Sequence, residues 1–247
     1  MLKAKIKENK IKVFFEIAEL IAGADIKLKG RKNDFEASMV DPAMVVMAEL
    51  KLNKKAFEEY SCDDMDLGID LNKMMPILKL ASSGQIIEFE YNDKQDKEHL
   101  IIRIENLTRK LRLIDPSDIK DTKFPALQLP GVIGIKTNEL TKGVKAAAAI
   151  SDHFKLTATK EYFELFAEGD TDEVSLKLPK DLLTELKTDK TYSSMFGIDY
   201  FQSLIKYAPE DLKLSLGNDN PVKIEYSFAE ESGIFTSMQA PRIEADK

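Results

Sequence analysis

The chain has 247 residues, with 36 Lys and Arg against 43 Asp and Glu, and a formal net charge of −7 at pH 7. Nucleic-acid binding usually shows as a basic excess, so this balance excludes a chain that is basic all over, although charges can be segregated onto one face. The single cysteine, Cys62, excludes an intramolecular disulfide. Neither a signal peptide nor a membrane-spanning apolar run is present, so we expect a soluble intracellular protein without a membrane partner.

The first half of the chain is expected to contain one long helix followed by short strands. Residues 9–22 carry apolar side chains at the spacing of one buried helical face, namely Ile11, Phe14, Phe15, Ala18 and Ile21. Alternating or apolar segments follow up to about residue 104, separated by polar loops. Residues 67–81 are typical of a strand end, the triplet Gly-Ile-Asp and a second, amphipathic helix.

The second half repeats this plan. Residues 196–208 again show a strand end, Gly-Ile-Asp and an amphipathic helix, and residues 137–151 are the counterpart of the first helix. Between the halves, residues 113–130 contain three prolines, and this segment is too long for a hairpin loop. We therefore predict an α+β protein of two similar domains, residues 1–113 and 131–247, joined by a connector at residues 114–130.

The residue types that catalysis and metal binding need are sparse. His99 and His153 lie one in each half, and neither has a Cys or His at metal-ligand spacing, which argues against zinc. Residues 62–66 lack the glycine and the distant glutamate of a calcium loop and are typical of a solvated turn. Cys62 could pair with either histidine, but no glycine elbow or oxyanion signature accompanies them. We expect no enzyme activity, no metal and no cofactor.

Lysines recur on the polar faces of all four expected helices. Lys142 and Lys145 are three residues apart and share a helical face, whereas Leu140 and Val144 turn inward. The other three helices carry Lys12, Lys73, Lys79 and Lys206. Ordinary solvated lysines would show the same pattern. However, acidic residues crowd the loops and strands, so helices that shared one surface would make that surface positive.

Five features together resemble the proliferating cell nuclear antigen family of DNA sliding clamps. They are the duplicated plan, the Asp-Pro strand "VDPAMVVMAEL", the segment "LGIDLNKMMPILK", the proline-punctuated connector and the C-terminal "MQAPRIEADK". The resemblance runs from Met1 to about Glu244. The segments "DPA" and "FPALQLP" look closer to the archaeal branch of the family than to the eukaryotic branch.

The resemblance implies a homotrimeric ring in which helices line a hole and antiparallel sheets form the outer wall. In this family the ring has no catalytic activity. It encircles double-stranded DNA independently of sequence and tethers DNA polymerase, flap endonuclease, DNA ligase, repair proteins and the clamp loader through short peptide motifs. The protein would lie in the cytoplasm or nucleoid of an archaeon, or in the nucleus of a eukaryote. Ring-closing strands are expected near residues 107–113 and 174–178.

The DNA-facing residues of the family can be carried over individually. The matching basic positions are Lys12, Lys79, Lys142, Lys145 and Lys206, and Lys73 joins them on its helix. Lysine attracts phosphate as a mobile point charge and does not read bases, which suits a sliding contact. Glu19 and Pro76 stand where relatives often have lysine, so the lining from the first domain is expected to be less basic.

The resemblance also implies a hydrophobic pocket for partner peptides, with apolar side chains presented around a turn that Asp41 and Pro42 fix. Its floor would be Val40, Met44 and Met47, its connector wall Phe124 and Pro125, and its C-terminal side Pro221, Met238, Ala240 and Pro241. Methionine suits a site for many partners because its flexible thioether repacks. Met44, Thr122 and Met238 stand where eukaryotic relatives have histidine, leucine and tyrosine, so peptide preference is expected to differ.

Three other interpretations stay open at this point. Within the family, the chain could be a subunit of a heterotrimeric or checkpoint-type clamp, which would remain monomeric alone. Outside the family, an α+β interaction protein that does not touch DNA would explain the acidity but not the lysines on four helices. A hydrolase that uses Cys62 and a histidine is the weakest of the three.

Overall fold

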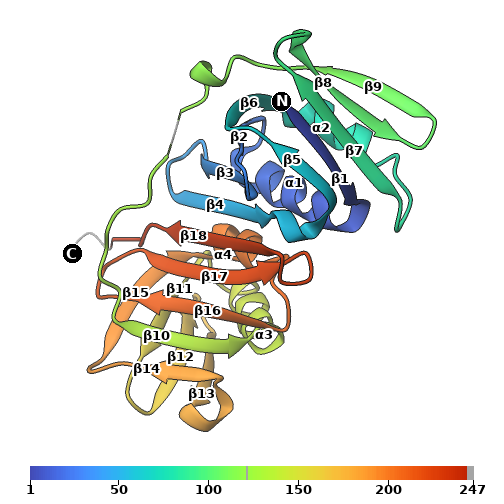
Figure 1. Ribbon diagram of the computed structural model, residues 1–247. Coiled ribbons are helices and arrows are strands. Elements are labelled where there is room, and N and C mark those ends of the chain that lie inside the picture. The colour runs from blue at the N-terminus through green and yellow to red at the C-terminus, as the bar shows by residue number, and fades with distance from the viewer. Residues whose placement is uncertain (121, 244–247) are drawn as a thin grey trace. The chain divides into compact units, whose positions relative to one another are not determined.

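The computed structural model of the chain describes residues 1–120 and 122–243. The chain divides into two compact units. Unit 1 consists of Met1–Lys123 and Ser227–Phe235, and unit 2 consists of Phe124–Tyr226 and Thr236–Lys247 (Figure 1).

Unit 1 packs two helices against two sets of antiparallel strands. Its elements in chain order are β1 (Leu2–Lys7), α1 (Glu8–Ala22), β2 (Asp25–Gly30), β3 (Asp34–Val40), β4 (Val46–Asn53), β5 (Phe57–Cys62), β6 (Met65–Asp70), α2 (Leu71–Leu78), β7 (Ile86–Asn92), β8 (Asp96–Ile104) and β9 (Leu107–Arg112). One sheet has the order β5-β1-β7-β8-β9, and a second set of strands has the order β4-β3-β2-β6.

Unit 2 has the same plan. Its elements are β10 (Gly131–Lys136), α3 (Thr137–Ala148), β11 (His153–Ala158), β12 (Tyr162–Glu168), β13 (Glu173–Pro179), β14 (Glu185–Lys187), β15 (Tyr192–Gly197), α4 (Ile198–Ile205) and β16 (Asp211–Leu216). The strands β17 (Val222–Phe228) and β18 (Gly233–Gln239) follow, each with residues in both units. The strand orders are β14-β10-β16-β17-β18 and β13-β12-β11-β15.

The internal duplication predicted from the sequence is confirmed element by element. Each half runs strand, helix, five strands, helix and three strands, and the strand orders of the two halves correspond position by position. The α+β fold class is likewise confirmed. The duplication places α1 and α2 in one unit at the positions that α3 and α4 occupy in the other.

The helices form where the apolar spacing predicts them. On α1 the five apolar residues that define the predicted face are all buried, and on α3 Leu140 and Val144 are buried while Lys142 and Lys145 are exposed. In α2 the Asp70 carboxylate accepts a hydrogen bond from Lys73 N at 3.2 Å and caps the first turn. The buried sides of the helices hold them on the strands of their own unit, and Lys73, Lys142 and Lys145 remain exposed.

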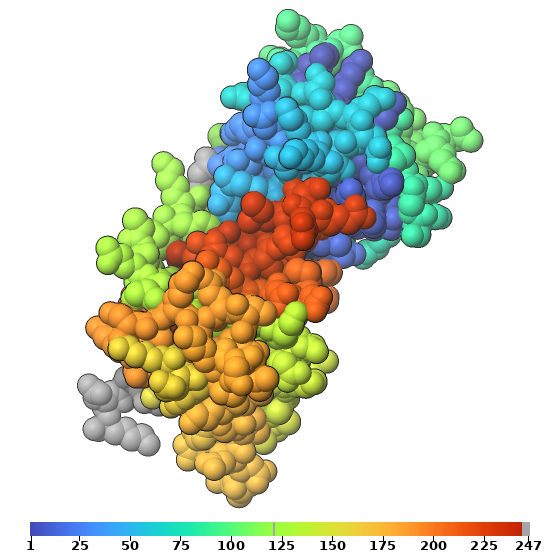
Figure 2. Space-filling model, turned by 60° about the horizontal axis from the view of Figure 1, so that its bottom comes forward, coloured from blue at the N-terminus to red at the C-terminus, as the bar shows by residue number. Residues whose placement is uncertain are grey.

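The segment expected to be the connector, residues 114–130, begins at a backbone contact with β6, and unit 1 extends to Lys123. Ile114 N donates to Gly68 O at 2.9 Å, and the backbone there is so close that a β-carbon on Gly68 would lie 2.3 Å from Ile114 O. A single 3₁₀ turn at Pro116–Asp118 follows, capped by the Asp115 side chain. Residues 122–130 form no helix or strand and lie at the surface (light green in Figure 2).

Candidate DNA-facing and peptide-binding surfaces

The lysines of unit 2 lie on and beside two neighbouring helices. Lys142 and Lys145 are exposed on α3, and Lys206 is exposed directly after α4. Lys142 Nζ forms an ion pair with Glu139 Oε1 at 2.8 Å, one turn earlier. The Lys206 ammonium lies 5.0 Å from the centre of the Tyr207 ring. The lysine face that the sequence predicts on these two helices is therefore accessible to a ligand.

A cavity of about 360 Å³ lies between α3 and α4, and both Lys145 and Lys206 line it. Its lining consists of Thr137, Thr141, Val144, Lys145, Gln202, Ile205 and Lys206. No carboxylate belongs to this lining, and neither lysine has an ion pair within the part of the chain that the structure describes. The buried Thr137 hydroxyl also has no hydrogen-bond partner there. Two ammonium groups beside hydroxyl and amide groups make a site that attracts an anion.

Sequence reasoning missed the polar residues of this cavity. Thr137, Thr141 and Lys145 are spaced four residues apart and therefore share one face of α3, so the spacing could have grouped them. Gln202 comes from α4, and only the packing of the two helices brings it to the same cavity.

The lysines of unit 1 are in three different situations. Lys12 is only 19% exposed, and its ammonium donates to Glu8 Oε1 and to Ala81 O, both at 2.8 Å. It therefore ties α1 to the segment after α2. Lys73 forms an ion pair with Asp70 Oδ2 at 2.9 Å, and Lys79 is exposed at the end of α2. The helix face of unit 1 thus offers fewer free cations than that of unit 2.

In unit 1, the Asp-Pro turn between β3 and β4 presents an exposed methionine. The buried Asp41 carboxylate accepts hydrogen bonds from Ala43 N, Val45 N and Val46 N at 3.0, 2.7 and 2.6 Å. Within the turn Met44 has φ 59° and is 72% exposed. A left-handed backbone is costly for a residue other than glycine, so the fold holds a large apolar side chain in water at some cost.

Two half-buried apolar side chains lie on the strands beside this turn. Val40 of β3 pairs with Met47 of β4, whereas the adjacent Met39 and Val46 are buried in the core. Because side chains alternate along a strand, Val40 and Met47 belong to the face that points away from the core of unit 1. Val40 and Met47 are therefore not ordinary core residues.

The remaining residues of the predicted pocket belong to unit 2. Phe124, Pro221, Ala240 and Pro241 are partly exposed and Pro125 is exposed, whereas Met238 is 7% exposed. Met238 therefore offers little surface of its own. The predicted pocket draws on both units, and each group of residues is accessible on its unit, apart from Met238.

Cys62, His99 and His153, which were considered for catalysis, each contact other groups. Burial raises the pKa of the Cys62 thiol, the opposite of what activates a nucleophile, and its Sγ lies 3.1 Å from Asp63 O. His99 Nδ1 contacts Asp96, and His153 Nδ1 lies 2.5 Å from Asp152 Oδ1. Across residues 1–120 and 122–243 there is no group of three or more side chains that could hold a metal.

Comparison with protein families gives two matches that together span nearly the whole chain. Residues 1–117 match the N-terminal domain of proliferating cell nuclear antigen, and residues 123–242 match its C-terminal domain. The chain belongs to the proliferating cell nuclear antigen family. The resemblance stated from the sequence is therefore confirmed.

Curated relatives carry the name DNA polymerase sliding clamp. The Methanocella arvoryzae and Methanosarcina mazei proteins are 36% and 35% identical to this chain, and each alignment covers 100% of both chains. The Haloarcula marismortui protein is 37% identical and covers 90% of this chain and 91% of its own. The chain is thus a sliding clamp by family, and the predicted archaeal branch is confirmed.

Solved structures of this family have the same fold. The A. fulgidus proliferating cell nuclear antigen (PCNA) was solved with the C-terminal region of FEN-1, and its alignment covers 100% of both chains with a TM-score of 0.93 and 26% identity. The Thermococcus kodakaraensis PCNA has a TM-score of 0.89 at 22% identity, covers 98% of this chain and all of its own, and so supports the fold alone. Among the described residues, no helix is long and apolar enough to cross a membrane.

Proposed function

We propose that three copies of this chain close into a ring around double-stranded DNA and tether replication and repair enzymes to it. The observation that carries this proposal is the lysine face of α3 and α4, because it concentrates unpaired positive charge on a chain whose formal net charge is −7. A ring of such chains would repel DNA if its charge were spread evenly. Basic helices that face the hole remove this difficulty.

The lysines would hold DNA loosely while the closed ring retains it. An ammonium group attracts any phosphate without the bidentate geometry that reads a base, so the ring is free to slide. Lys142, Lys145 and Lys206 carry most of this contact, joined by Lys73 and Lys79. Lys12 contributes less, since its ammonium is already bound by Glu8 and Ala81.

The pocket for partner peptides would combine Val40, Met44 and Met47 of unit 1 with Phe124, Pro125, Pro221, Met238, Ala240 and Pro241 of unit 2. The exposed, left-handed Met44 supports this assignment, as does the relative that was solved with a region of FEN-1. DNA polymerase, flap endonuclease, DNA ligase and the clamp loader are the expected owners of such peptides. Tethering converts a weak contact between enzyme and DNA into an intramolecular one.

The chain itself would catalyse no reaction and would act inside the cell, where chromosomal DNA lies. The raised pKa of Cys62 and the separate contacts of the two histidines support a protein that is not an enzyme. The domains would be residues 1–113 and 131–247, with residues 114–130 as the connector between them.

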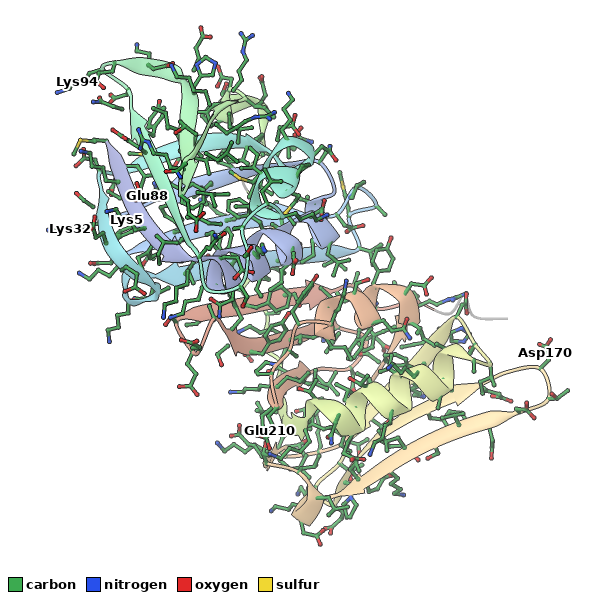
Figure 3. All side chains as sticks on the ribbon, turned by 90° about the vertical axis from the view of Figure 1, so that its right-hand side faces the viewer. Lys5, Lys32, Glu88, Lys94, Asp170 and Glu210 are labelled. Carbon is green, nitrogen blue, oxygen red and sulfur yellow. The ribbon has the colours of Figure 1, made fainter. Side chains whose placement is uncertain are left out.

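A paired charge-removal experiment tests the role of the helix face. The test variant carries Lys145→Ala and Lys206→Ala, and the control carries Lys32→Ala and Lys94→Ala at two exposed lysines outside the helices (Figure 3). Both lose two positive charges. The test variant should lose most of its stimulation of processive DNA synthesis at moderate salt, whereas the control should keep it. Equal stimulation by both variants would contradict the proposed DNA-facing helices.

A further inference from the structure

The chain that follows β18 is fixed at two points in unit 2. Before it, the fully buried Gln239 donates from Nε2 to Gly197 O at 2.8 Å. After it, Arg242 N donates to Met195 O of β15 at 2.7 Å. Ala240 and Pro241 lie between these two anchors, and we call residues 240–243 the tail segment.

The side chain of Arg242 makes a third attachment. Its Nη1 lies 2.8 Å from Asp152 Oδ2, across 90 residues of sequence. The other carboxylate oxygen, Oδ1, lies 2.5 Å from His153 Nδ1. The Asp152 carboxylate thus holds the imidazole of its neighbour and the guanidinium of the tail segment at the same time.

Asp152 is itself held firmly by the backbone. It follows the last turn of α3, and its carbonyl accepts a hydrogen bond from Ile198 N, the first residue of α4, at 2.9 Å. Its backbone therefore joins the end of one lysine-bearing helix to the start of the other. A carboxylate whose backbone is hydrogen-bonded in this way is suited to orienting the tail segment.

The hydrogen bond from His153, followed by that from Arg242, lowers the pKa of Asp152 to about 2. Asp152 is therefore ionised at neutral pH, and the attachment is present under ordinary conditions. As an exposed ion pair it adds little to global stability, because Asp152 is 72% and Arg242 49% exposed. Its effect is local, on the conformational freedom of the tail segment.

We propose that Asp152 is a positioning residue that fixes the tail segment through Arg242 and so prepares Ala240 and Pro241 to receive a partner peptide. This inference rests on the proposed function, in which Ala240 and Pro241 border the peptide pocket. A tail segment that is ordered before binding loses less conformational entropy when the peptide arrives. The Asp152 carboxylate would then contribute to peptide affinity without contacting the peptide.

Two measurements on the full chain test this inference. Peptide affinity is measured by calorimetry with a synthetic peptide that copies the C-terminal region of FEN-1 from the A. fulgidus complex. Hydrogen exchange of the backbone amides of Gln239, Ala240, Arg242 and Ile243 reports directly on the tail segment. The variants are Asp152→Ala, Arg242→Ala, the double variant and the conservative Arg242→Lys. Asp219→Asn is the matched control, because Asp219 lines the same cavity as Arg242 but forms no part of the attachment.

We expect Asp152→Ala and Arg242→Ala each to speed exchange in the tail segment and to weaken peptide binding about threefold to tenfold. The double variant should be no weaker than either single variant, since both remove one interaction. Arg242→Lys should retain most of the affinity, and Asp219→Asn all of it. Rescue by lysine separates positioning from a general loss of structure.

Three results would overturn the inference. Unchanged exchange in Asp152→Ala would mean that the ion pair does not order the tail segment. Fast exchange with unchanged affinity would mean that ordering does not matter for the peptide. If the unmodified chain binds no peptide at all, the proposed pocket is wrong, and the exchange data still show separately whether Asp152 holds the tail segment.

Discussion

Asp41 organises a whole turn with one carboxylate. It is 6% exposed and accepts three backbone hydrogen bonds from residues 43, 45 and 46, so the amides of the turn are satisfied without water. Pro42 is exposed, and its ring restricts its own φ angle and the backbone of the residue before it. The two residues of the Asp-Pro pair therefore stabilise the turn by different mechanisms, and these can be separated.

We predict that Asp41→Ala lowers the free energy of unfolding by about 2–3 kcal/mol, because it leaves three amides without their acceptor. Pro42→Ala should cost less than about 1 kcal/mol, because it only adds freedom to the unfolded chain. Urea denaturation of both variants measures the difference. Equal losses would contradict this, because they would show that the proline stabilises the turn as much as the carboxylate does.

Met44 is expected to contribute to binding and not to stability. Met44→Gly relieves the positive φ angle but adds freedom to the unfolded chain, so the free energy of unfolding should change by less than about 0.5 kcal/mol. Affinity for the FEN-1 peptide should fall about fivefold through lost apolar contact. Denaturation measures the free energy of unfolding, and calorimetry on the same sample measures the peptide affinity. Unchanged affinity would remove Met44 from the pocket.

The ion pair of Asp152 gives a prediction about pH. Its folded-state pKa is about 2, below its ordinary value of 3.8, so its stabilising contribution is present above 3.8 and disappears as the pH falls to about 2. Asp152→Asn should therefore be slightly less stable than the unmodified chain at neutral pH. Denaturation curves at a series of pH values should show this difference fade between about 4 and 2. A difference that persists to the lowest pH would contradict the ionic origin.

At the scale of elements, the two Gly-Ile-Asp triplets have the same sequence but different surroundings. Gly68 lies in β6 with the backbone of Ile114 against it, whereas Gly197 precedes α4, and a β-carbon added there would lie 3.9 Å from its nearest neighbours, Gln239 and Tyr200. The first glycine is needed for the close approach of the connector. The second could carry a side chain.

Alanine at the two glycines makes a matched pair. Gly68→Ala should destabilise the chain by about 1–3 kcal/mol, because the added methyl group overlaps a backbone carbonyl that cannot move freely. Gly197→Ala should change the free energy of unfolding by less than about 0.5 kcal/mol. Thermal or urea denaturation compares them directly. Comparable effects at both sites would show that Ile114 moves aside easily.

The sequence predicts the elements better than their contacts. The buried face of α1 and the repeat of the two halves follow from local spacing, which a single chain displays. Local spacing could not predict that the Lys12 ammonium is bound, because Ala81, whose carbonyl accepts its hydrogen bond, is 69 residues away. The cavity between α3 and α4 and the attachment of Arg242 to Asp152 likewise depend on packing between distant segments.

At the scale of the whole molecule, one edge strand is basic and the turn before another edge strand is acidic. β9 is at the edge of its sheet and exposes Arg109, Lys110 and Arg112. β13 is at the edge of the other set of strands in unit 2, and the turn before it exposes Asp170 and Asp172, followed by Glu173 (Figure 3). Edge strands with free backbone groups are sites where a second chain can add. The two strand segments predicted to close the ring are thus available, each on its own unit.

Pairing of β9 from one copy with β13 from the next joins unlike surfaces, so the contact can repeat until a ring closes. If charge guides this pairing, Arg109→Glu with Lys110→Glu should shift the particle from three chains of 27.9 kDa each toward monomers in a dilution series followed by light scattering. Lys94→Glu in the β7–β8 turn with Lys97→Glu at the start of β8 makes the same charge change at two exposed lysines and should leave the mass unchanged. Adding Asp170→Lys and Asp172→Lys to the first variant should restore assembly, because the attraction is then reversed on both edges. If the unmodified chain is monomeric, the result would instead favour a heteromeric clamp. If none of these substitutions changes the mass of the particle, the ring is closed by backbone pairing and apolar contact alone.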